Sequence, residues 1–179
     1  MVNKIRSILK RFIIKIRFPN KAISIDPSSI IYPKSRIRII SGGSIIIGKN
    51  CKIHDYSMIL SYKGNIEIGD NCSVNPYTIL YGHGGLKIGN GVRIAAHCVI
   101  IPSNHKFERL DVPIYQQGEI SKGIIIEDDV WIGAHCSILD GVRIGKGCVI
   151  GAGSVVNKSL PDFSVAVGVP ARVISKRGE

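Results

Sequence analysis

The chain has 179 residues, of which 45% are hydrophobic and 6% aromatic, with 20 glycines and a formal net charge of +11 at pH 7. This length fits one domain with a core of its own, and the isoleucine-rich, aromatic-poor composition favours strands over helices. The charge is uneven, because seven basic residues and no acidic residue lie in the first 21 positions. The sequence has no helix-turn-helix, zinc or RNA-binding motif, so we do not expect nucleic acid as a partner.

Residues 1–20 form the first predicted element, a short basic amphipathic helix. Apolar residues recur there at the i, i+3, i+4, i+7 spacing, namely Ile5, Ile8, Leu9, Phe12, Ile13 and Ile16. No apolar run approaches the roughly 20 residues of a membrane span, and no signal-peptide pattern is present. We expect a cytoplasmic protein whose helix either docks on the body or a neighbouring subunit, or lies peripherally on the inner face of an anionic membrane.

Residues 21–179 form the second predicted unit, which is built on a six-residue period. Aliphatic residues start its clearest repeats at Ile126, Ile132, Ile138, Ile144 and Ile150, and earlier ones at Ile47, Ile53, Ile68, Val74, Ile88 and Ile94. Such a period is the signature of a solenoid, and the 18 residues from Ile126 to Ile144 make one coil of three hexapeptides. We expect about six coils, spaced by the roughly 4.8 Å between neighbouring strands.

The cysteines test this interpretation. All five share one position, four residues after the aliphatic residue, which Ser57, Thr78, Val92, Val130, Val142 and Ser154 occupy in other repeats; the cysteines are Cys51, Cys72, Cys98, Cys136 and Cys148. A shared register indicates packing, so we expect small interior residues with free thiols. There is no C-x-x-C pair, and we expect no metal site.

The repeat fails once, between Ile88 and Ile126, which are 38 residues apart. The stretch that follows IIPSNHKFE is polar and carries no hexapeptides, so it is predicted to be a long excursion loop over residues 103–123. Long loops in compact domains are usually functional or disordered.

Several motifs together carry a family resemblance. Residues 25 to about 174 contain D-D-V-W-I-G, G-A-G-S-V-V and G-V-P-A-R, and they resemble the hexapeptide-repeat acyltransferases, closest to the polysaccharide and sugar O-acetyltransferases. The resemblance implies an all-β, left-handed parallel β-helix that assembles as a homotrimer with active sites between subunits. It also implies coenzyme A as the acyl carrier.

Site residues follow from matching positions. His105, at the root of the loop, matches the family's catalytic base, and an imidazole with an ordinary pKa near ~6.5 suits proton removal from a hydroxyl. Glu119 matches a loop glutamate that binds the acceptor or orients the base, although a solvated loop acid is nearly as well supported. Asn75 matches an acceptor-binding asparagine, with a simple turn residue as the alternative, and Trp131 is expected to pack beside His105 or to form only a hydrophobic wall.

The remaining assignments concern the acyl donor. Some relatives place a serine hydroxyl where this chain has Ala134, so only the backbone N–H of Ala134 is expected to stabilise the oxyanion. The resemblance places the pantetheine arm of coenzyme A along Gly151, Ala152, Gly153 and Ser154. Lys158 and Arg172 are expected to pair with its phosphates, with ordinary solvated charges as the alternative.

The leading function is therefore an acetyl-CoA-dependent O-acetyltransferase acting on a sugar hydroxyl of a polysaccharide or lipid-linked glycan. N-acetylation of an amino sugar or of an antibiotic is the alternative, and a non-enzymatic scaffold or a γ-class carbonic anhydrase is less well supported. His97 and His135 share one repeat position and are expected to be stacked surface imidazoles, with an accessory role in the groove left open. Their spacing from His105 is a poor match to a three-histidine zinc site.

Overall fold

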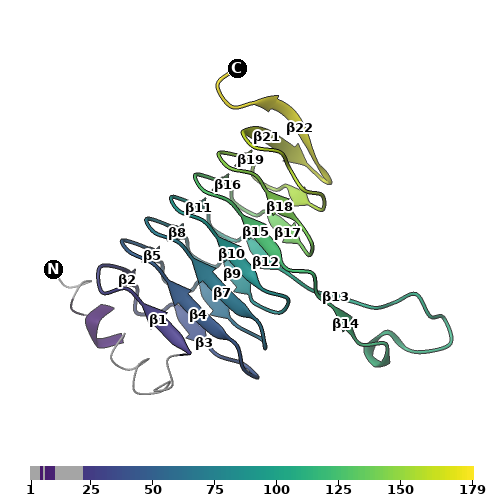
Figure 1. The fold of residues 1–179 in the computed structure, drawn as a ribbon, viewed down its shortest axis with the longest axis horizontal. Helices are drawn as coiled ribbons and strands as arrows, with labels where there is room; N and C mark the ends of the chain where they lie inside the picture. Colours follow the sequence, from purple (N-terminus) through teal and green to yellow (C-terminus); the bar gives the residue numbers. More distant parts are fainter. Residues whose placement is uncertain (1–4, 6, 11–21) are drawn as a thin grey trace.

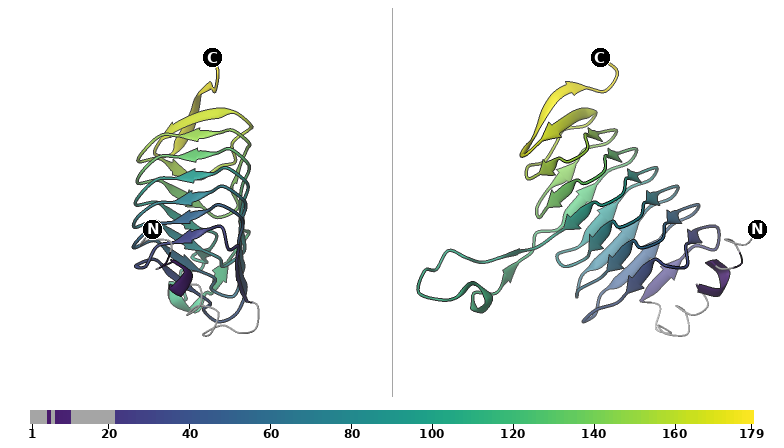
Figure 2. Two further views of the ribbon diagram at one scale, coloured as in Figure 1. Left: turned by 90° about the vertical axis from the view of Figure 1, so that its left-hand side faces the viewer. Right: turned by 180° about the vertical axis from the view of Figure 1, so that it is seen from behind.

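The computed structural model describes residues 5, 7–10 and 22–179. Its body is an all-β prism of about six stacked coils, in which three parallel sheets form the three faces (Figure 1). The coils lie above one another from the N-terminal to the C-terminal end, as Figure 2 shows from two further sides. The predicted β-solenoid is thereby confirmed.

Each coil contributes one strand to each face. Sheet A contains β1 (Ile23–Ile25), β4 (Ser44–Ile47), β7 (Asn65–Ile68), β10 (Leu86–Ile88), β15 (Ile124–Ile126) and β18 (Arg143–Ile144). Sheet B contains β2 (Ile30–Ile31), β5 (Lys52–Ile53), β8 (Ser73–Val74), β11 (Arg93–Ile94), β16 (Trp131–Ile132), β19 (Val149–Ile150), β21 (Ser164–Gly168) and β22 (Ala171–Lys176). Sheet C contains β3 (Arg36–Arg38), β6 (Met58–Leu60), β9 (Ile79–Tyr81), β12 (Val99–Ile101), β17 (Ser137–Leu139) and β20 (Val155–Val156).

The register explains why the period is six. Ile68, Ile88, Ile126 and Ile144 lie side by side in sheet A, and each is almost fully buried. Residues that alternate with them point outward, because successive side chains of a strand face opposite sides. Every aliphatic residue that starts a repeat therefore joins one continuous core.

The cysteines line the same interior. All five are buried and free, as predicted from their shared position. Burial raises the pKa of the Cys148 thiol above its ordinary value. These residues fill the core as small groups, and each thiol donates a weak hydrogen bond to a backbone carbonyl at 3.0–3.1 Å.

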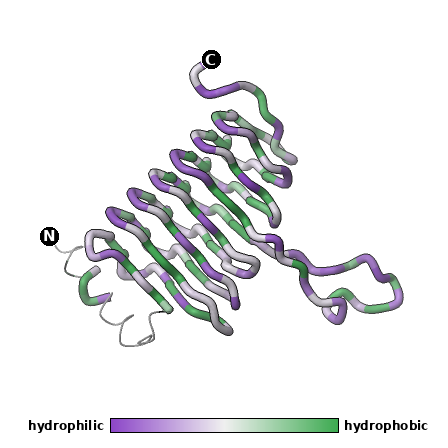
Figure 3. The backbone as a smooth tube through the Cα atoms, viewed as in Figure 1, coloured by the Kyte–Doolittle hydropathy of each residue, from purple (hydrophilic) through white to green (hydrophobic). Residues whose placement is uncertain are grey.

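The predicted excursion leaves the prism at the corner between sheets C and A. Residues 103–123, called the hairpin from here on, contain β13 (Asn104–His105) paired antiparallel with β14 (Glu119–Ile120), and a 3-10 turn at Ile114–Gln116. Figure 1 shows the hairpin projecting far from the coils, and Figure 3 shows it as mainly hydrophilic beside the hydrophobic strands.

Both ends of the prism are covered. At the C-terminal end β21 and β22 form an antiparallel pair that the hexapeptide pattern does not predict, and the G-V-P-A-R motif makes their turn.

At the N-terminal end residues 5 and 7–10 are helical. Ser7 accepts a hydrogen bond from the Ile31 N–H at 2.9 Å, and the Lys10 ammonium donates to the carbonyl of Tyr32 at 3.2 Å. The rest of the helix predicted over residues 1–20, including Phe12, Ile13 and Ile16, lies outside the described residues.

Candidate active site

The root of the hairpin brings two of the predicted site residues together. His105 on β13 lies directly opposite Glu119 on β14, and both side chains are exposed. Directly opposite residues in an antiparallel pair share one face, with Cβ atoms about 4.5–5.5 Å apart. The carboxylate of Glu119 is therefore placed where it can orient the imidazole of His105, although no hydrogen bond joins them in the single described chain.

Neighbouring coils hold this root in place. The Asp140 carboxylate accepts hydrogen bonds from the N–H groups of Lys122 and Gly123, at 2.8 and 2.9 Å, where the chain returns to the prism. The Gly84 N–H donates to the Pro102 carbonyl at 3.2 Å, where the chain departs. A Cβ at Gly84 would lie 2.7 Å from the Cβ of Ser121, so only glycine lets the two segments approach this closely.

A second group of predicted residues lies at a different corner, between sheets B and C. Asn75 follows β8, Ala134 follows β16, and residues 151–154 follow β19. The Asn75 side-chain nitrogen donates to the Ile94 carbonyl at 2.7 Å, which leaves its oxygen available to a ligand. The Ala134 N–H makes no hydrogen bond within the part of the chain that the structure describes, as an oxyanion donor requires.

The residues expected to hold coenzyme A differ in accessibility. Ala152 and Gly153 are exposed and Gly151 is half-buried, whereas Ser154 is fully buried. The Ser154 hydroxyl donates to the Gly151 carbonyl at 2.7 Å and accepts from the Gly168 N–H at 3.0 Å. This hydroxyl supports the corner from inside, so contacts with a ligand there fall to the other residues of 151–154.

The three remaining predicted residues lie on separate surfaces. Trp131 is 55% exposed on sheet B, between Arg93 and Val149. It makes no ring contact with His105 among the described residues, so the structure does not bring these two side chains together within one chain.

Both predicted phosphate ligands are exposed. Lys158 follows β20 at the corner between sheets C and A, and Arg172 is the second residue of the return strand β22. Neither forms a salt bridge within residues 22–179. The predicted residues therefore fall into distant groups, with the base at one corner and the oxyanion donor at another.

The prediction for the two corner histidines is confirmed. The rings of His97 and His135 stack with centroids 4.8 Å apart and an interplanar angle of 4°. The stack continues through Tyr77 to Tyr56, at 4.9 and 5.1 Å, which the sequence analysis missed. Both tyrosines occupy the same repeat position as the histidines, so the signal was present in the sequence.

In the described residues, no group of three His, Cys, Asp or Glu side chains is arranged to hold a metal ion.

Comparison with known proteins identifies relatives of this chain. Residues 123–158 match the family model described as bacterial transferase hexapeptide (six repeats). A probable acetyltransferase of Mycobacterium tuberculosis is 32% identical over 156 residues, which is 78% of this chain but only 52% of that protein. The chain thus spans about half the length of that relative. A galactoside O-acetyltransferase of Lactococcus lactis is 32% identical over 153 residues, covering 84% of this chain and 72% of that protein.

Solved structures include one that holds an amino sugar nucleotide and coenzyme A. A variant of AntD, an N-acyltransferase from Bacillus cereus, is in complex with dTDP-4-amino-4,6-dideoxyglucose and coenzyme A. It superimposes with a TM-score of 0.77 at 28% identity, over 92% of this chain and 89% of that chain. The likeness extends over the prism and is not confined to the repeat motif.

Proposed function

The chain belongs to the hexapeptide-repeat acyltransferase family, and from this premise we propose that it transfers an acetyl group from acetyl-CoA to a sugar hydroxyl. The acceptor is a polysaccharide or a lipid-linked glycan. The observation that carries the proposal is the His105–Glu119 pair at the hairpin root, because it offers a base and an orienting carboxylate outside a prism that is otherwise closed.

The proposed reaction is a direct transfer. The imidazole of His105 takes the proton of the acceptor hydroxyl while the hydroxyl oxygen attacks the thioester carbonyl carbon. The Ala134 N–H donates to the developing oxyanion. The carbon–sulfur bond then breaks, the thiolate of coenzyme A leaves, and the imidazolium returns the proton to it. Glu119 orients His105, and no acyl-enzyme is formed.

We place the complete site between two copies in a homotrimer. The base and the proposed oxyanion donor lie at different corners of one chain, so a neighbouring copy has to bring its B–C corner to the hairpin. The outward face of sheet C supports such packing, because Met58, Ile79 and Val99 form a half-buried apolar row along it, which Ser137 separates from Val155. Ile114 and Tyr115 of the hairpin also expose apolar surface.

Subunit mixing tests the shared site. Chains carrying His105→Ala and chains carrying Ala152→Trp, which blocks the proposed coenzyme A wall, are each expected to be inactive. In a random one-to-one mixture about a quarter of all interfaces, which is one in each mixed trimer, combine an intact hairpin with an intact corner, so part of the activity returns. If co-expressed chains form mixed oligomers and stay inactive, the site is not shared.

We place coenzyme A along the corner between sheets B and C. Ala152 and Gly153 leave an accessible wall for the pantetheine arm, and Lys158 and Arg172 offer cations to the phosphates. Trp131 and Asn75 belong to the acceptor side in this proposal. Asn75 contributes its free amide oxygen, and Trp131 contributes an exposed ring on sheet B.

N-acylation of an amino sugar is the second candidate. The supporting observation is the Bacillus cereus N-acyltransferase, whose structure holds an amino sugar nucleotide and coenzyme A. The same base and oxyanion donor serve an amine, since the nitrogen attacks the thioester in place of oxygen. Comparing matched sugars that differ only in bearing a hydroxyl or an amine at one carbon separates the two candidates.

A peripheral membrane contact through residues 1–20 is a further part of the proposal. Ile5, Ile8 and Leu9 are exposed, while Ser7 and Lys10 of the same helix contact the prism. An apolar face beside cationic residues suits an anionic lipid surface. No helix in the described ranges has the length and hydropathy required to cross a bilayer. Deleting residues 2–17 is expected to reduce flotation with anionic vesicles, and unchanged flotation would contradict this contact.

Thiol release from acetyl-CoA tests the activity. The panel contains free sugars, nucleotide sugars and lipid-linked oligosaccharides, and wild-type protein is expected to release thiol with at least one of them. His105→Ala is expected to lower kcat by about 100- to 10,000-fold, the usual contribution of a general base. Lys49→Gln, a change to an exposed lysine at the corner between sheets A and B, serves as the control. Activity that survives His105→Ala would overturn the mechanism.

A further inference from the structure

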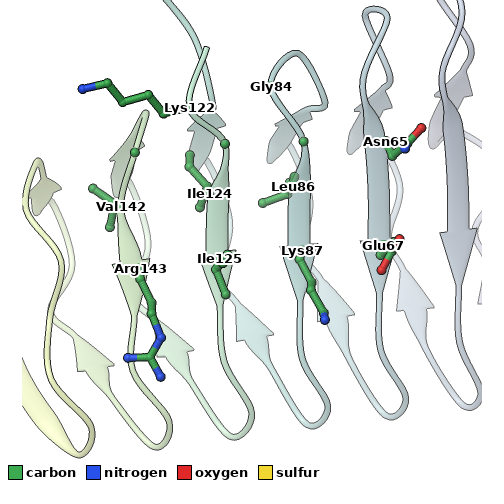
Figure 4. A pocket seen from close by; sticks show the side chains of 13 residues that line it. Asn65, Glu67, Gly84, Leu86, Lys87, Lys122, Ile124, Ile125, Val142 and Arg143 are labelled. Carbon is green, nitrogen blue, oxygen red and sulfur yellow. The ribbon is translucent and has the colours of Figure 1, made fainter.

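A groove on the outer face of sheet A lies beside the hairpin root. Its volume is about 430 Å³, within the ~300–1,000 Å³ range of ligand sites. Its apolar floor is the side chain of Ile125, which is 42% exposed. Leu86, Ile124 and Val142 also border the groove but are at most 3% exposed, because their side chains face the core. Gly84, Gly85, Gly123 and Gly141 line its edge at the C–A corner. Figure 4 shows these strands with the charged side chains that surround the floor.

Three cations and one carboxylate line this groove. Lys87 and Arg143 lie on either side of Ile125 in the register of sheet A, so they stand about 9–10 Å apart across two strand spacings. Lys122 joins them from the corner, where its side chain lies over Gly141. Glu67 is the one acid, directly opposite Lys87.

Two of these cations have no anionic partner. Arg143 is engaged, because its guanidinium lies 3.0 Å from Glu127 and 3.7 Å from Asp162. Lys87 and Lys122 form no salt bridge with any residue in the described ranges, and both are exposed. Two free ammonium groups above an apolar floor are complementary to an organic phosphate, whose anionic head needs cations and whose body needs a non-polar surface.

The other groove of sheet A has the opposite character. It has a volume of about 650 Å³ and is lined by four carboxylate residues, namely Glu67, Asp70, Glu127 and Asp128, with Lys87 as its only lysine. An anion is therefore repelled there and attracted to the groove beside the hairpin.

Chain geometry links this groove to the reaction. Lys122 follows Glu119 by three residues, which span at most about 11 Å, and Glu119 lies opposite His105. Most residues expected to hold coenzyme A lie elsewhere on the chain, in the B–C corner and on β22, and Lys158, although at the C–A corner, does not line the groove. The cations of the sheet A groove are thus a separate set, close to the base.

We propose that this groove binds the diphosphate of an activated acceptor sugar, with Lys87 and Lys122 as the phosphate ligands. The proposal rests on the proposed function, because it names the acceptor class of the same site. The diphosphate sits against the two ammonium groups, and the attached sugar extends from Lys122 towards His105. Nucleotide-linked and polyprenyl-linked sugars share this diphosphate, so the groove fits both by the same chemistry.

Binding to the full-length protein tests the proposal without requiring acetyl transfer. Calorimetric titrations use inorganic pyrophosphate, UDP-glucose, farnesyl diphosphate and coenzyme A. Wild-type protein is expected to bind UDP-glucose or farnesyl diphosphate, and the one that binds identifies the source of the diphosphate. Lys87→Gln and Lys122→Gln are each expected to weaken that binding about tenfold, with a change below about twofold for coenzyme A. Lys49→Gln, an exposed lysine outside the groove, is the matched control and is expected to change neither.

Three results would overturn the proposal. One is absence of saturable binding of every diphosphate to the wild-type protein. Another is an equal loss of coenzyme A affinity in Lys87→Gln and Lys122→Gln, which would assign the cations to the donor. The third is an equal loss in Lys49→Gln, which would show non-specific charge attraction. Failure of the acetyltransferase proposal would look different, because thiol release would be absent while diphosphate binding remained.

Discussion

The prism and the hairpin differ in what holds them together. In the prism the repeated aliphatic positions are almost completely buried, and each coil is bonded to the coils above and below it. In the hairpin no residue from 104 to 122 is buried, the two paired strands have two residues each, and Leu110 is 99% exposed. Its one salt bridge joins Arg109 to Asp111 at the surface, where such pairs contribute little.

This difference assigns separate tasks to the two regions. Apolar burial stabilises the prism. The hairpin adds almost nothing to that core, yet it carries the candidate base and its orienting carboxylate. Substitutions in the prism should therefore change stability, whereas substitutions in the hairpin should change the reaction.

The largest expected effect on stability comes from the core. Ile138→Ala removes a fully buried side chain from sheet C and is expected to lower the free energy of unfolding by about 2–5 kcal/mol. Leu110→Ala in the hairpin is expected to cost less than about 0.5 kcal/mol, because its side chain is almost fully exposed. Urea denaturation of both variants measures this contrast. Equal costs would show that the hairpin belongs to the cooperative folding unit.

Much of this fold is predictable from the sequence because its interactions are local and periodic. Each aliphatic residue stacks on its equivalent one coil away, so the six-residue period fixes both burial and register. The course of the hairpin is not encoded in this way, since residues 103–123 carry no period. The antiparallel pair β21–β22 also escaped prediction, because the motif that makes its turn resembles a ligand-binding signature.

The candidate site was predictable in part for the same reason. Its residues were identified by their positions in the family's motifs, but a motif does not show which corner of the prism a residue occupies. The sequence therefore did not predict that His105 and Ala134 lie at different corners of the prism. Ser154 is instructive, because it occupies the inward position of the cysteines, and that repeat position already indicated a buried side chain.

The next largest expected effect is a decrease in kcat without a change in stability. Glu119→Gln keeps the size of the side chain but removes the charge opposite His105, so kcat is expected to fall about 10- to 100-fold with little change in unfolding free energy. Glu108→Gln is the matched control, since Glu108 is another exposed acid of the hairpin and should be nearly silent. Steady-state kinetics of both variants decide between an orienting carboxylate and a solvated one. Equal effects would remove the special role of Glu119.

A smaller effect is expected where the two regions meet. Asp140→Ala removes the acceptor of the Lys122 and Gly123 N–H groups and is expected to cost roughly 1 kcal/mol in stability. Asp140→Asn keeps an oxygen acceptor and should lose less. Hydrogen exchange at the two amides measures the local effect, which should be faster exchange in Asp140→Ala than in Asp140→Asn. Unchanged exchange in both variants would show that the carboxylate does not anchor the hairpin.

The smallest expected effect is the pH response of one prism histidine. Burial, followed by the nearby Lys52 ammonium, lowers the pKa of His54 below its ordinary value near 6.5, and its ring stacks on Tyr32 at 4.6 Å. Between the lowered pKa and the ordinary one, the unfolded chain binds a proton that the folded chain does not, so stability falls as the pH decreases through that range. His54→Gln cannot take up this proton. Its urea midpoint should therefore decrease less than that of the wild-type protein between pH 7.5 and 5.5, because the substituted prism has lost one source of acid sensitivity. Identical decreases would show that protonation of His54 is not coupled to unfolding of the prism.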